Sequence, residues 1–312
     1  MSCFTVSIVG SFRLDLTVWV LRRQAHNAMD LWDGEYYRRA WDYQGEWLML
    51  RLRQLQSMPT SILEGEILHG PRHPEAIAWV QKRLHWILGL DQDLAAFHSM
   101  AQGDARLRPL SERYQGMRPP RFNSLFEGLV NAIVCQQLSL MVAITLLNRL
   151  CQLCARASAT KELSYPFPSP QQILEQDPLR LREIGFSRQK IRSLFAVAQA
   201  AVDGALDECR WQHRPRAEIM DRLQQLPGIG RWSAEYILLR ALGRLEVFPG
   251  DDVGGRNGLF RWLGRDPKGA SYEETLAQVA PWSPYAGMVY FLMLLRRLEA
   301  DGHIPPQEPS AH

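Results

Sequence analysis

The sequence predicts an α+β protein, in which an N-terminal antiparallel β-rich lobe precedes an all-helical domain. From about residue 4 to residue 70, apolar and polar residues often alternate with a period of two, which is typical of strands with one face in water. A polar connector with arginines and prolines follows at 106–121, and beyond it apolar residues recur at helical spacing. We therefore divide the chain into an α+β lobe at 1–110, a helical domain at 111–300 and a disordered tail at 301–312.

Two alternating segments and one helical segment define the first lobe. Residues 12–18 and 48–52 show the alternation, and each segment is predicted to form a strand. Residues 74–88 have apolar side chains three and four positions apart, which predicts a helix with one buried face. Those side chains are Ile77, Val80, Leu84 and Ile87.

In the helical domain, polar breaks and capping residues set the helix limits. The apolar run 125–154 is interrupted by Cys135-Gln136-Gln137-Leu138-Ser139. This break predicts two helices joined by a glutamine-rich turn, with Ser139 capping the second helix. Further helices are predicted at 169–176 and 188–203 from their capping serines and the breakers that follow.

The composition is that of a soluble globular protein, with 46% hydrophobic residues, 22% charged residues and a net charge of +3. This charge permits a nucleic-acid partner without requiring one. No segment reaches the roughly 18 uninterrupted apolar residues of a membrane helix, and we expect no export signal, so a cytoplasmic location is predicted. The five cysteines suit free thiols. Because Cys151 and Cys154 form a single pair and the histidines show no ligand spacing, we predict no metal site.

The most informative segment is a glycine turn between two short helical patterns. Two glycines flank one apolar residue in Pro227-Gly228-Ile229-Gly230, so the backbone can bend tightly and point successive N–H groups outward. A phosphate fits there because the second helix, from Arg231 to about residue 242, begins with unpaired donors and a positive dipole end. The alternative is a helical hairpin that binds no ligand.

Aromatic and acidic residues follow this turn. Trp232 and Tyr236 lie four positions apart on one helix face, where they form either a stacking wall for a base or part of the core. In the corner Pro249-Gly250-Asp251-Asp252, we interpret Asp251 as a turn residue with a solvated helix cap. Asp252 lies 24 positions after the first glycine of the turn, so a helix of about 16 Å and its returning loop can bring it back to the turn.

A Leu-Pro-Gly-Ile-Gly hairpin followed by an aspartate at this spacing resembles the helix-hairpin-helix DNA glycosylase superfamily, and within it the AlkA-type 3-methyladenine DNA glycosylase II family. Five segments match in the family's order: the β-rich lobe, residues 126–139, Gly185-Phe186-Ser187-Arg188-Gln189-Lys190, the hairpin, and Pro281-Trp282-Ser283-Pro284-Tyr285-Ala286. The resemblance implies a TBP-like N-terminal lobe and a helix-hairpin-helix glycosylase domain. It also implies a DNA-repair enzyme of bacterial type, associated with the nucleoid, that acts as a monomer and without a cofactor on double-stranded DNA with a damaged base.

The resemblance assigns roles to the residues after the hairpin. Asp252 matches the family's catalytic carboxylate, which stabilises positive charge on the sugar as the N-glycosidic bond breaks. Trp232 and Tyr236 match aromatic residues of the pocket that receives the flipped base, so the resemblance favours stacking over core packing. A tryptophan–tyrosine pair on the family's last helix corresponds here to Phe291 and Leu292. We include Phe291 in the pocket, and the departure bears on the choice of damaged base.

For DNA contacts the resemblance points to two turns. The residues of the hairpin turn are Pro227, Gly228, Ile229, Gly230 and Arg231. Their backbone amides and the arginine side chain are expected to contact phosphates. The second turn holds Gln136 and Gln137 and is expected to fill the gap left by the flipped base, although the best-known pattern has a leucine in place of Gln137. As in relatives, the hairpin carbonyls can hold a structural alkali ion.

The residue two positions after the second hairpin glycine indicates which reaction to expect. Bifunctional branches carry a nucleophilic lysine there, whereas this chain has Trp232. The resemblance therefore implies a monofunctional glycosylase that excises alkylated bases, 3-methyladenine and related ones. No cysteine follows Cys209, so the four-cysteine iron–sulfur cluster of another branch is not expected. Two alternatives stay open: a bifunctional oxidised-purine glycosylase of the 8-oxoguanine type, and a non-catalytic helix-hairpin-helix module that only binds DNA.

Overall fold

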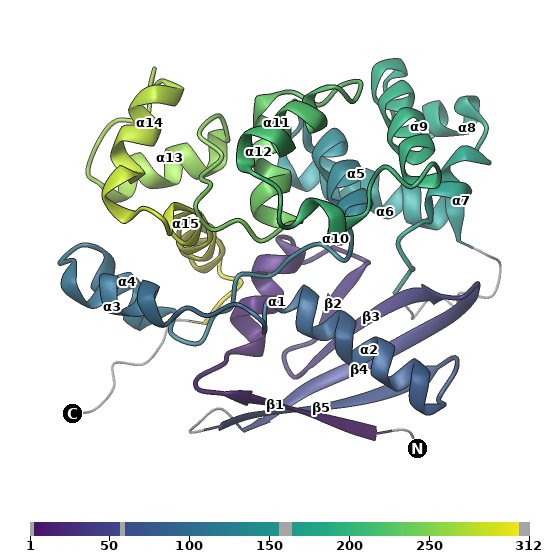
Figure 1. The fold of residues 1–312 in the computed structure, drawn as a ribbon, viewed down its shortest axis with the longest axis horizontal. Coiled ribbons are helices and arrows are strands. Elements are labelled where there is room, and N and C mark those ends of the chain that lie inside the picture. The colour runs from purple at the N-terminus through teal and green to yellow at the C-terminus, as the bar shows by residue number, and fades with distance from the viewer. Residues whose placement is uncertain (1–2, 57–59, 156–163, 306–312) are drawn as a thin grey trace.

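The N-terminal part of the chain is an antiparallel five-stranded sheet in the order β1-β5-β4-β3-β2 (Figure 1). The structure, a computed structural model, describes residues 3–56, 60–155 and 164–305. The strands are β1 (Cys3–Val9), β2 (Asp30–Trp32), β3 (Tyr36–Tyr43), β4 (Glu46–Gln56) and β5 (Thr60–His69). The predicted antiparallel β-rich lobe is confirmed, and the alternation at residues 48–52 lies in β4.

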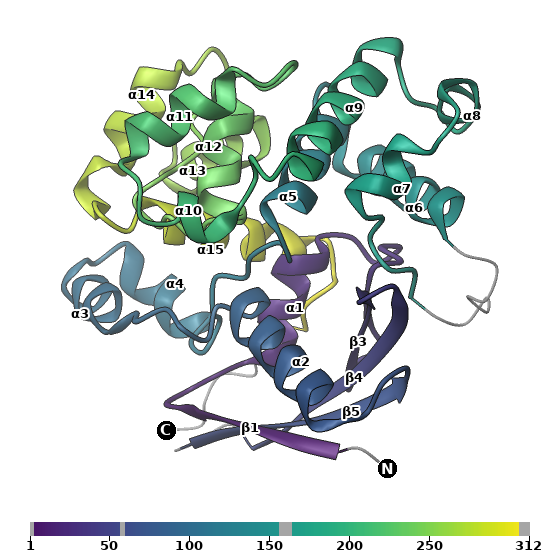
Figure 2. The same ribbon diagram turned by 45° about the vertical axis from the view of Figure 1, so that its right-hand side comes forward.

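Helix α2 (Pro74–Ile87) lies across this sheet (Figure 2). Proline in the first turn and the His73 ring, which accepts a hydrogen bond from the Ala76 N–H, start the helix. Its buried side chains pack into the core of the sheet, and Ile77 is partly buried at their edge. They are Ala76, Val80, Leu84 and Ile87. The helix predicted at 74–88 is confirmed.

Residues 12–18, predicted as a strand, instead lead into helix α1 (Leu14–Arg22), so that prediction is wrong. Nearly every side chain of α1 is buried, because the helix packs against the sheet on one side and the helical part on the other. Leu14, Val18 and Leu21 belong to the first of these cores, and Leu16, Trp19 and Val20 to the second. A helix buried on all sides needs no polar stripe, which is why its sequence lacks helical spacing of polar residues.

The rest of the described chain is helical, as predicted. The helices are α3 (Ala95–Gly103), α4 (Leu107–Arg113), α5 (Leu125–Cys135), α6 (Leu140–Cys154), α7 (Pro170–Leu174), α8 (Pro178–Glu183), α9 (Arg188–Val202), α10 (Glu208–Trp211), α11 (Arg216–Gln224), α12 (Arg231–Arg240), α13 (Val253–Trp262), α14 (Tyr272–Val279), the 3-10 helix η1 (Ala280–Trp282) and α15 (Ala286–Ala300). The glutamine-rich turn separates α5 from α6, and the Ser139 hydroxyl caps α6. Both features agree with the sequence prediction.

The segment 106–121, predicted as a polar connector between the two parts of the chain, contributes apolar side chains to a core. It contains α4, whose Leu107 and Leu110 are buried in the core of the helical part, as are Tyr114 and Met117 after it. The core of the helical part therefore includes residues on both sides of position 110. The domain limits 1–110 and 111–300 stay a prediction.

Buried ion pairs join the sheet to the helical part. The Arg39 guanidinium on β3 donates to an Asp30 oxygen on β2 at 2.7 Å and to a Glu127 oxygen on α5 at 2.6 Å. All three side chains are at most 6% exposed. Because the desolvated cation bridges two carboxylates, it holds α5 in a fixed place relative to the sheet.

The predicted tail is anchored where it begins. The His303 ring stacks on Trp19 of α1 with centroids 4.8 Å apart, and Ile304 is buried. The disordered tail predicted from residue 301 is therefore wrong for residues 301–305, and its remainder, 306–312, lies outside the described residues. Within the described ranges, no helix is both long and apolar enough to span a membrane.

Candidate active site

The glycine turn between α11 and α12 has the geometry that its sequence predicts. Ile229 is buried in the core, while Pro227, Gly228 and Gly230 are exposed. Gly228 has φ +82°, and a Cβ there would collide with the Ser193 hydroxyl, so this position requires glycine. No side chain caps the N-terminus of α12, which leaves backbone N–H groups available to an anion.

The glutamine turn is tied to the glycine turn. The Gln136 side-chain amide donates to the Gly228 carbonyl at 2.7 Å and to the Ser233 hydroxyl at 2.9 Å. Lys190 of α9 donates to two carbonyls at the end of α5, and burial lowers the pKa of its amine. Gln137 is exposed, with φ +56°. Of the two glutamines predicted to fill the gap left by a flipped base, Gln136 is thus held by the hairpin and Gln137 is exposed.

Asp252 lies beside the aromatic pair, at the start of α13. One carboxylate oxygen accepts the Gly255 backbone N–H at 2.6 Å, and the other accepts the Trp232 indole N–H at 3.1 Å. Asp252 is therefore the N-cap of α13, whereas the sequence interpretation gave the solvated cap to Asp251. Both donors fix the plane of the carboxylate, and the side chain stays partly exposed.

Asp251 instead accepts a hydrogen bond from the Arg231 guanidinium at 2.8 Å. The same guanidinium lies 3.7 Å from the centroid of the Tyr272 ring. Hydrogen bonding to Asp251 raises the pKa of Arg231. Tyr272 in turn donates to the buried carboxylate of Glu235 at 2.7 Å. Arg231, predicted to contact a phosphate, is thus already paired with Asp251, and this cluster fixes the corner before Asp252.

Trp232 and Tyr236 stack with centroids 5.4 Å apart and an interplanar angle of 21°. Trp232 is partly exposed, whereas Tyr236 is buried, and burial raises the pKa of the Tyr236 phenol. The Tyr236 hydroxyl accepts a hydrogen bond from Arg23 at 2.8 Å. The outer face of this aromatic wall therefore belongs to Trp232, and Tyr236 forms its inner end.

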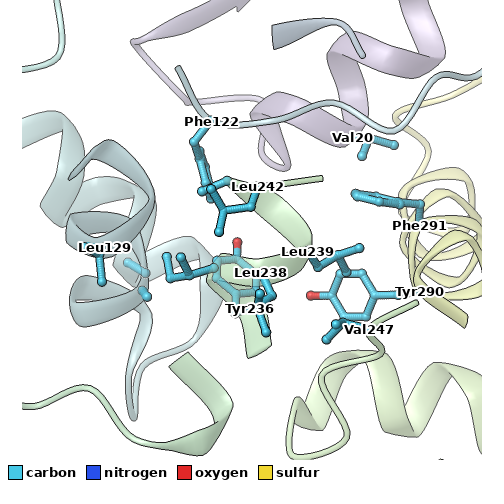
Figure 3. Close-up of a cluster of buried hydrophobic side chains, with 14 of the residues drawn as sticks. Val20, Phe122, Leu129, Tyr236, Leu238, Leu239, Leu242, Val247, Tyr290 and Phe291 are labelled. Carbon is cyan, nitrogen blue, oxygen red and sulfur yellow. The ribbon is translucent and has the colours of Figure 1, made fainter. Parts of the chain in front are cut away.

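Phe291, predicted to line the base pocket, is completely buried in α15. It lies beside Val20 of α1 (Figure 3), and the Arg240 guanidinium is 5.3 Å from its ring centroid. The preceding residue, Tyr290, faces the site instead: its ring packs on Gly255, and burial, together with the nearby Asp252 charge, raises its pKa well above the usual value. The sequence shows that Tyr290 is an aromatic neighbour of Phe291. It does not show which of the two rings faces Asp252.

The described residues contain no group of three or more histidine, cysteine, aspartate or glutamate side chains that could hold a metal ion. The alkali ion expected at the hairpin carbonyls stays a prediction. The Gly228 carbonyl accepts the Gln136 amide and the Leu226 carbonyl accepts the Ile229 N–H, so an ion there would share oxygens that are already hydrogen-bonded.

A glycine turn with an open helix N-terminus, next to a carboxylate held against an aromatic pair, defines a DNA-repair protein of the helix-hairpin-helix class. Comparison with known families agrees: the model described as "HhH-GPD superfamily base excision DNA repair protein" matches residues 130–284. The chain belongs to this superfamily, and within it to the AlkA-type 3-methyladenine DNA glycosylases.

Three similar proteins illustrate the relationship. DNA-3-methyladenine glycosylase 1 of Schizosaccharomyces pombe is 34% identical over 164 residues, which are 52% of this chain and 68% of that protein. The solved structure of a 3-methyladenine DNA glycosylase from Archaeoglobus fulgidus has a TM-score of 0.81 and 25% identity, covering 95% of this chain and 98% of that one. A Schizosaccharomyces pombe 3-methyladenine DNA glycosylase in complex with abasic DNA has a TM-score of 0.55 and 27% identity. The match covers 68% of this chain and 98% of that one.

Proposed function

We propose that this chain is a monofunctional DNA glycosylase that excises alkylated bases, 3-methyladenine and related ones, in base excision repair. The observation that carries the proposal is the Asp252 carboxylate, fixed by the Trp232 indole N–H at the edge of a stacking wall and next to the glycine turn. The printed names of the similar proteins point to the same substrate class.

The proposed reaction uses each part of this geometry. The damaged nucleotide turns out of the duplex, and its base stacks on the exposed face of Trp232. As the bond between C1′ and the base breaks, positive charge develops on the sugar, and the Asp252 carboxylate stabilises it electrostatically. Water then adds to C1′ and releases a proton. Base release by the purified protein from duplexes with methylated, deaminated or oxidised bases tests this proposal, and no release of any of them would reject it.

The monofunctional mechanism predicts that the protein forms no covalent adduct with DNA. Trp232 stands where a bifunctional enzyme has its lysine, and the Lys190 amine nearby is occupied with the Val134 and Gln136 carbonyls. An imine to the sugar requires a free amine. Borohydride treatment of the protein with abasic duplex DNA is therefore expected to trap nothing. A trapped adduct would favour the bifunctional alternative.

We expect Gly230→Ala to weaken duplex binding roughly 10-fold, with little sequence dependence and a shallower salt dependence, because the methyl group intrudes on a phosphate at the start of α12. A Cβ at Gly230 meets nothing within 4 Å in the protein, so folding is preserved, unlike at Gly228. Gly103 of α3 also has open space around it and provides the matched control Gly103→Ala. Equal binding by both variants, measured by fluorescence anisotropy at several salt concentrations, would show that the turn does not hold DNA.

The proposed enzyme works alone on double-stranded DNA. We expect a monomer mass in solution with and without a short duplex, measured by light scattering. The cytoplasmic, nucleoid-associated location stays a prediction from the sequence.

A further inference from the structure

Arg23, the residue that ends α1, places a buried guanidinium behind the aromatic wall. Its backbone has φ +62°, a conformation that non-glycine residues rarely adopt, and its side chain is 4% exposed. The guanidinium donates to the Tyr236 hydroxyl at 2.8 Å and to the Asn131 side-chain oxygen at 2.7 Å, and lies 3.9 Å from the Cys135 sulfur. The chain thus brings a cation from the N-terminal lobe to the back of the base pocket.

This cation has only neutral partners. Among the residues that the structure describes, Arg23 forms no ion pair and its Nε has no hydrogen-bond partner. Arg39, equally buried, shows the usual arrangement, with two carboxylates around one guanidinium. A second such cation, Arg240, lies close by between the rings of Phe122 and Phe291 and donates to the Val20 carbonyl. A buried charge without a counter-ion is costly, so its presence calls for a compensating role.

Arg23 and Asp252 lie at opposite ends of the aromatic wall. The Arg23 guanidinium contacts Tyr236, Tyr236 stacks on Trp232, and Trp232 donates to the Asp252 carboxylate. A base stacked on Trp232 therefore lies in a field that is negative toward its sugar and positive toward the back of the pocket. Direct contact with Arg23 is not required, because the Arg23 guanidinium and Tyr236 are buried, and a charge that water does not surround acts over several ångströms.

Such a field distinguishes neutral from cationic bases. A purine alkylated at N3 or N7, such as 3-methyladenine or 7-methylguanine, is a cation in DNA, and when the bond to C1′ breaks it takes the electron pair and leaves neutral. A neutral damaged base takes the same pair and leaves with negative charge, until it gains a proton. A fixed cation behind the pocket opposes binding of a cationic base. It stabilises the negative charge that a neutral damaged base carries as it leaves.

We propose that Arg23 determines specificity in this pocket, by raising the release of neutral damaged purines relative to that of cationic alkylated ones. This inference rests on the proposed glycosylase activity and assigns to Arg23 how strongly that activity reaches deaminated or oxidised purines beside the alkylated ones. In the reaction, C1′ loses the base and gains the oxygen of water, and the proton from water balances the charge of the departing base.

The test compares two duplexes in the same protein preparation, one with deoxyinosine as the neutral base and one with 7-methyldeoxyguanosine as the cationic base. The readout is the ratio of their second-order release rate constants, measured in single turnovers with excess protein kept below saturation, because these constants include the effect of Arg23 on binding of the cationic base. The ratio does not depend on the fraction of active protein. Arg23→Gln is expected to lower the neutral-to-cationic ratio by about 10-fold or more, the size expected of one charge acting at this range. Arg23→Lys keeps the charge and is expected to stay within about 3-fold of the wild type.

A second variant tests the same point without removing the arginine. Asn131→Asp places a carboxylate on the atom that already accepts the Arg23 hydrogen bond, so it neutralises the field with almost no change of shape. It is expected to lower the ratio as Arg23→Gln does, and it decides the matter if Arg23→Gln does not fold. A ratio that changes less than 2-fold in these variants, or a wild type that releases only the cationic base, would overturn the inference. A wild type that releases neither base would instead count against the proposed function.

Discussion

Asp252→Asn is expected to lower the rate of base release by at least about 100-fold, the scale of removing one preorganised electrostatic group from an active site. Asparagine is an equally good N-cap, and its amide oxygen can still accept the Gly255 N–H, so the fold is retained. Its amide nitrogen cannot accept the Trp232 N–H, so that hydrogen bond is lost. The negative charge near C1′ is lost together with the acceptor for the Trp232 indole N–H. Single-turnover release from a duplex with an alkylated base measures the effect.

Asp251→Asn is the matched control for this substitution. Asp251 is the neighbouring acid of the same corner, but it pairs with Arg231 and not with the indole of the aromatic wall. We expect it to retain release within about 10-fold of the wild type, because an exposed ion pair contributes little. Asp252→Asn should also bind a duplex with an abasic-site analogue as tightly as the wild type. Similar rates for the two variants would remove Asp252 from its assigned role.

Arg39→Met is expected to destabilise the protein by about 3–5 kcal/mol, because it leaves Asp30 and Glu127 buried without their cation. Burial raises the pKa of Glu127, and loss of Arg39 removes the attraction that opposes this. A carboxyl whose pKa is raised on folding stabilises the protein at low pH and loses that contribution as pH rises. The deficit should therefore be smaller in mildly acidic than in mildly alkaline buffer, as measured by urea denaturation.

Arg38→Met, one position away on β3, controls for the loss of an arginine as such. Arg38 pairs with Asp33 at 2.5 Å, and both side chains are about one-third exposed, at 31% and 39%. Removal of a pair this accessible to water should cost at most about 1 kcal/mol. An equal loss of stability in both variants would show that the buried ion pairs do not join the sheet to the helical part as described.

The sequence was sufficient where one local rule decided the structure. The glycine turn, the serine caps and the amphipathic helix α2 were predicted correctly, because each depends on residues within a few positions of one another. Helix α1 was predicted wrongly because tertiary packing overrides local periodicity: it is buried between two cores, so its pattern carries no helical stripe.

The parts of the site that depend on distant segments were out of reach. Gln136 bonds a carbonyl 92 positions away, and Arg23 a hydroxyl 213 positions away, and no spacing in the sequence predicts such pairs. The sequence does show two arginines, Arg22-Arg23, directly after an apolar run. Their position next to apolar residues was a signal for a functional role, because charged residues are rarely buried without a reason. On α15, a shift of one residue separates the buried Phe291 from Tyr290, which packs beside the Asp252 segment.

The central claim is that the Asp252 carboxylate stabilises positive charge at the position of the sugar. The most direct measurement compares the affinities for two duplexes, one with a cationic pyrrolidine in place of the sugar ring and one with a neutral tetrahydrofuran. The wild type is expected to prefer the cationic ring by at least about 10-fold, or about 1.4 kcal/mol, and Asp252→Asn to lose this preference. The same preference in both proteins would contradict the account.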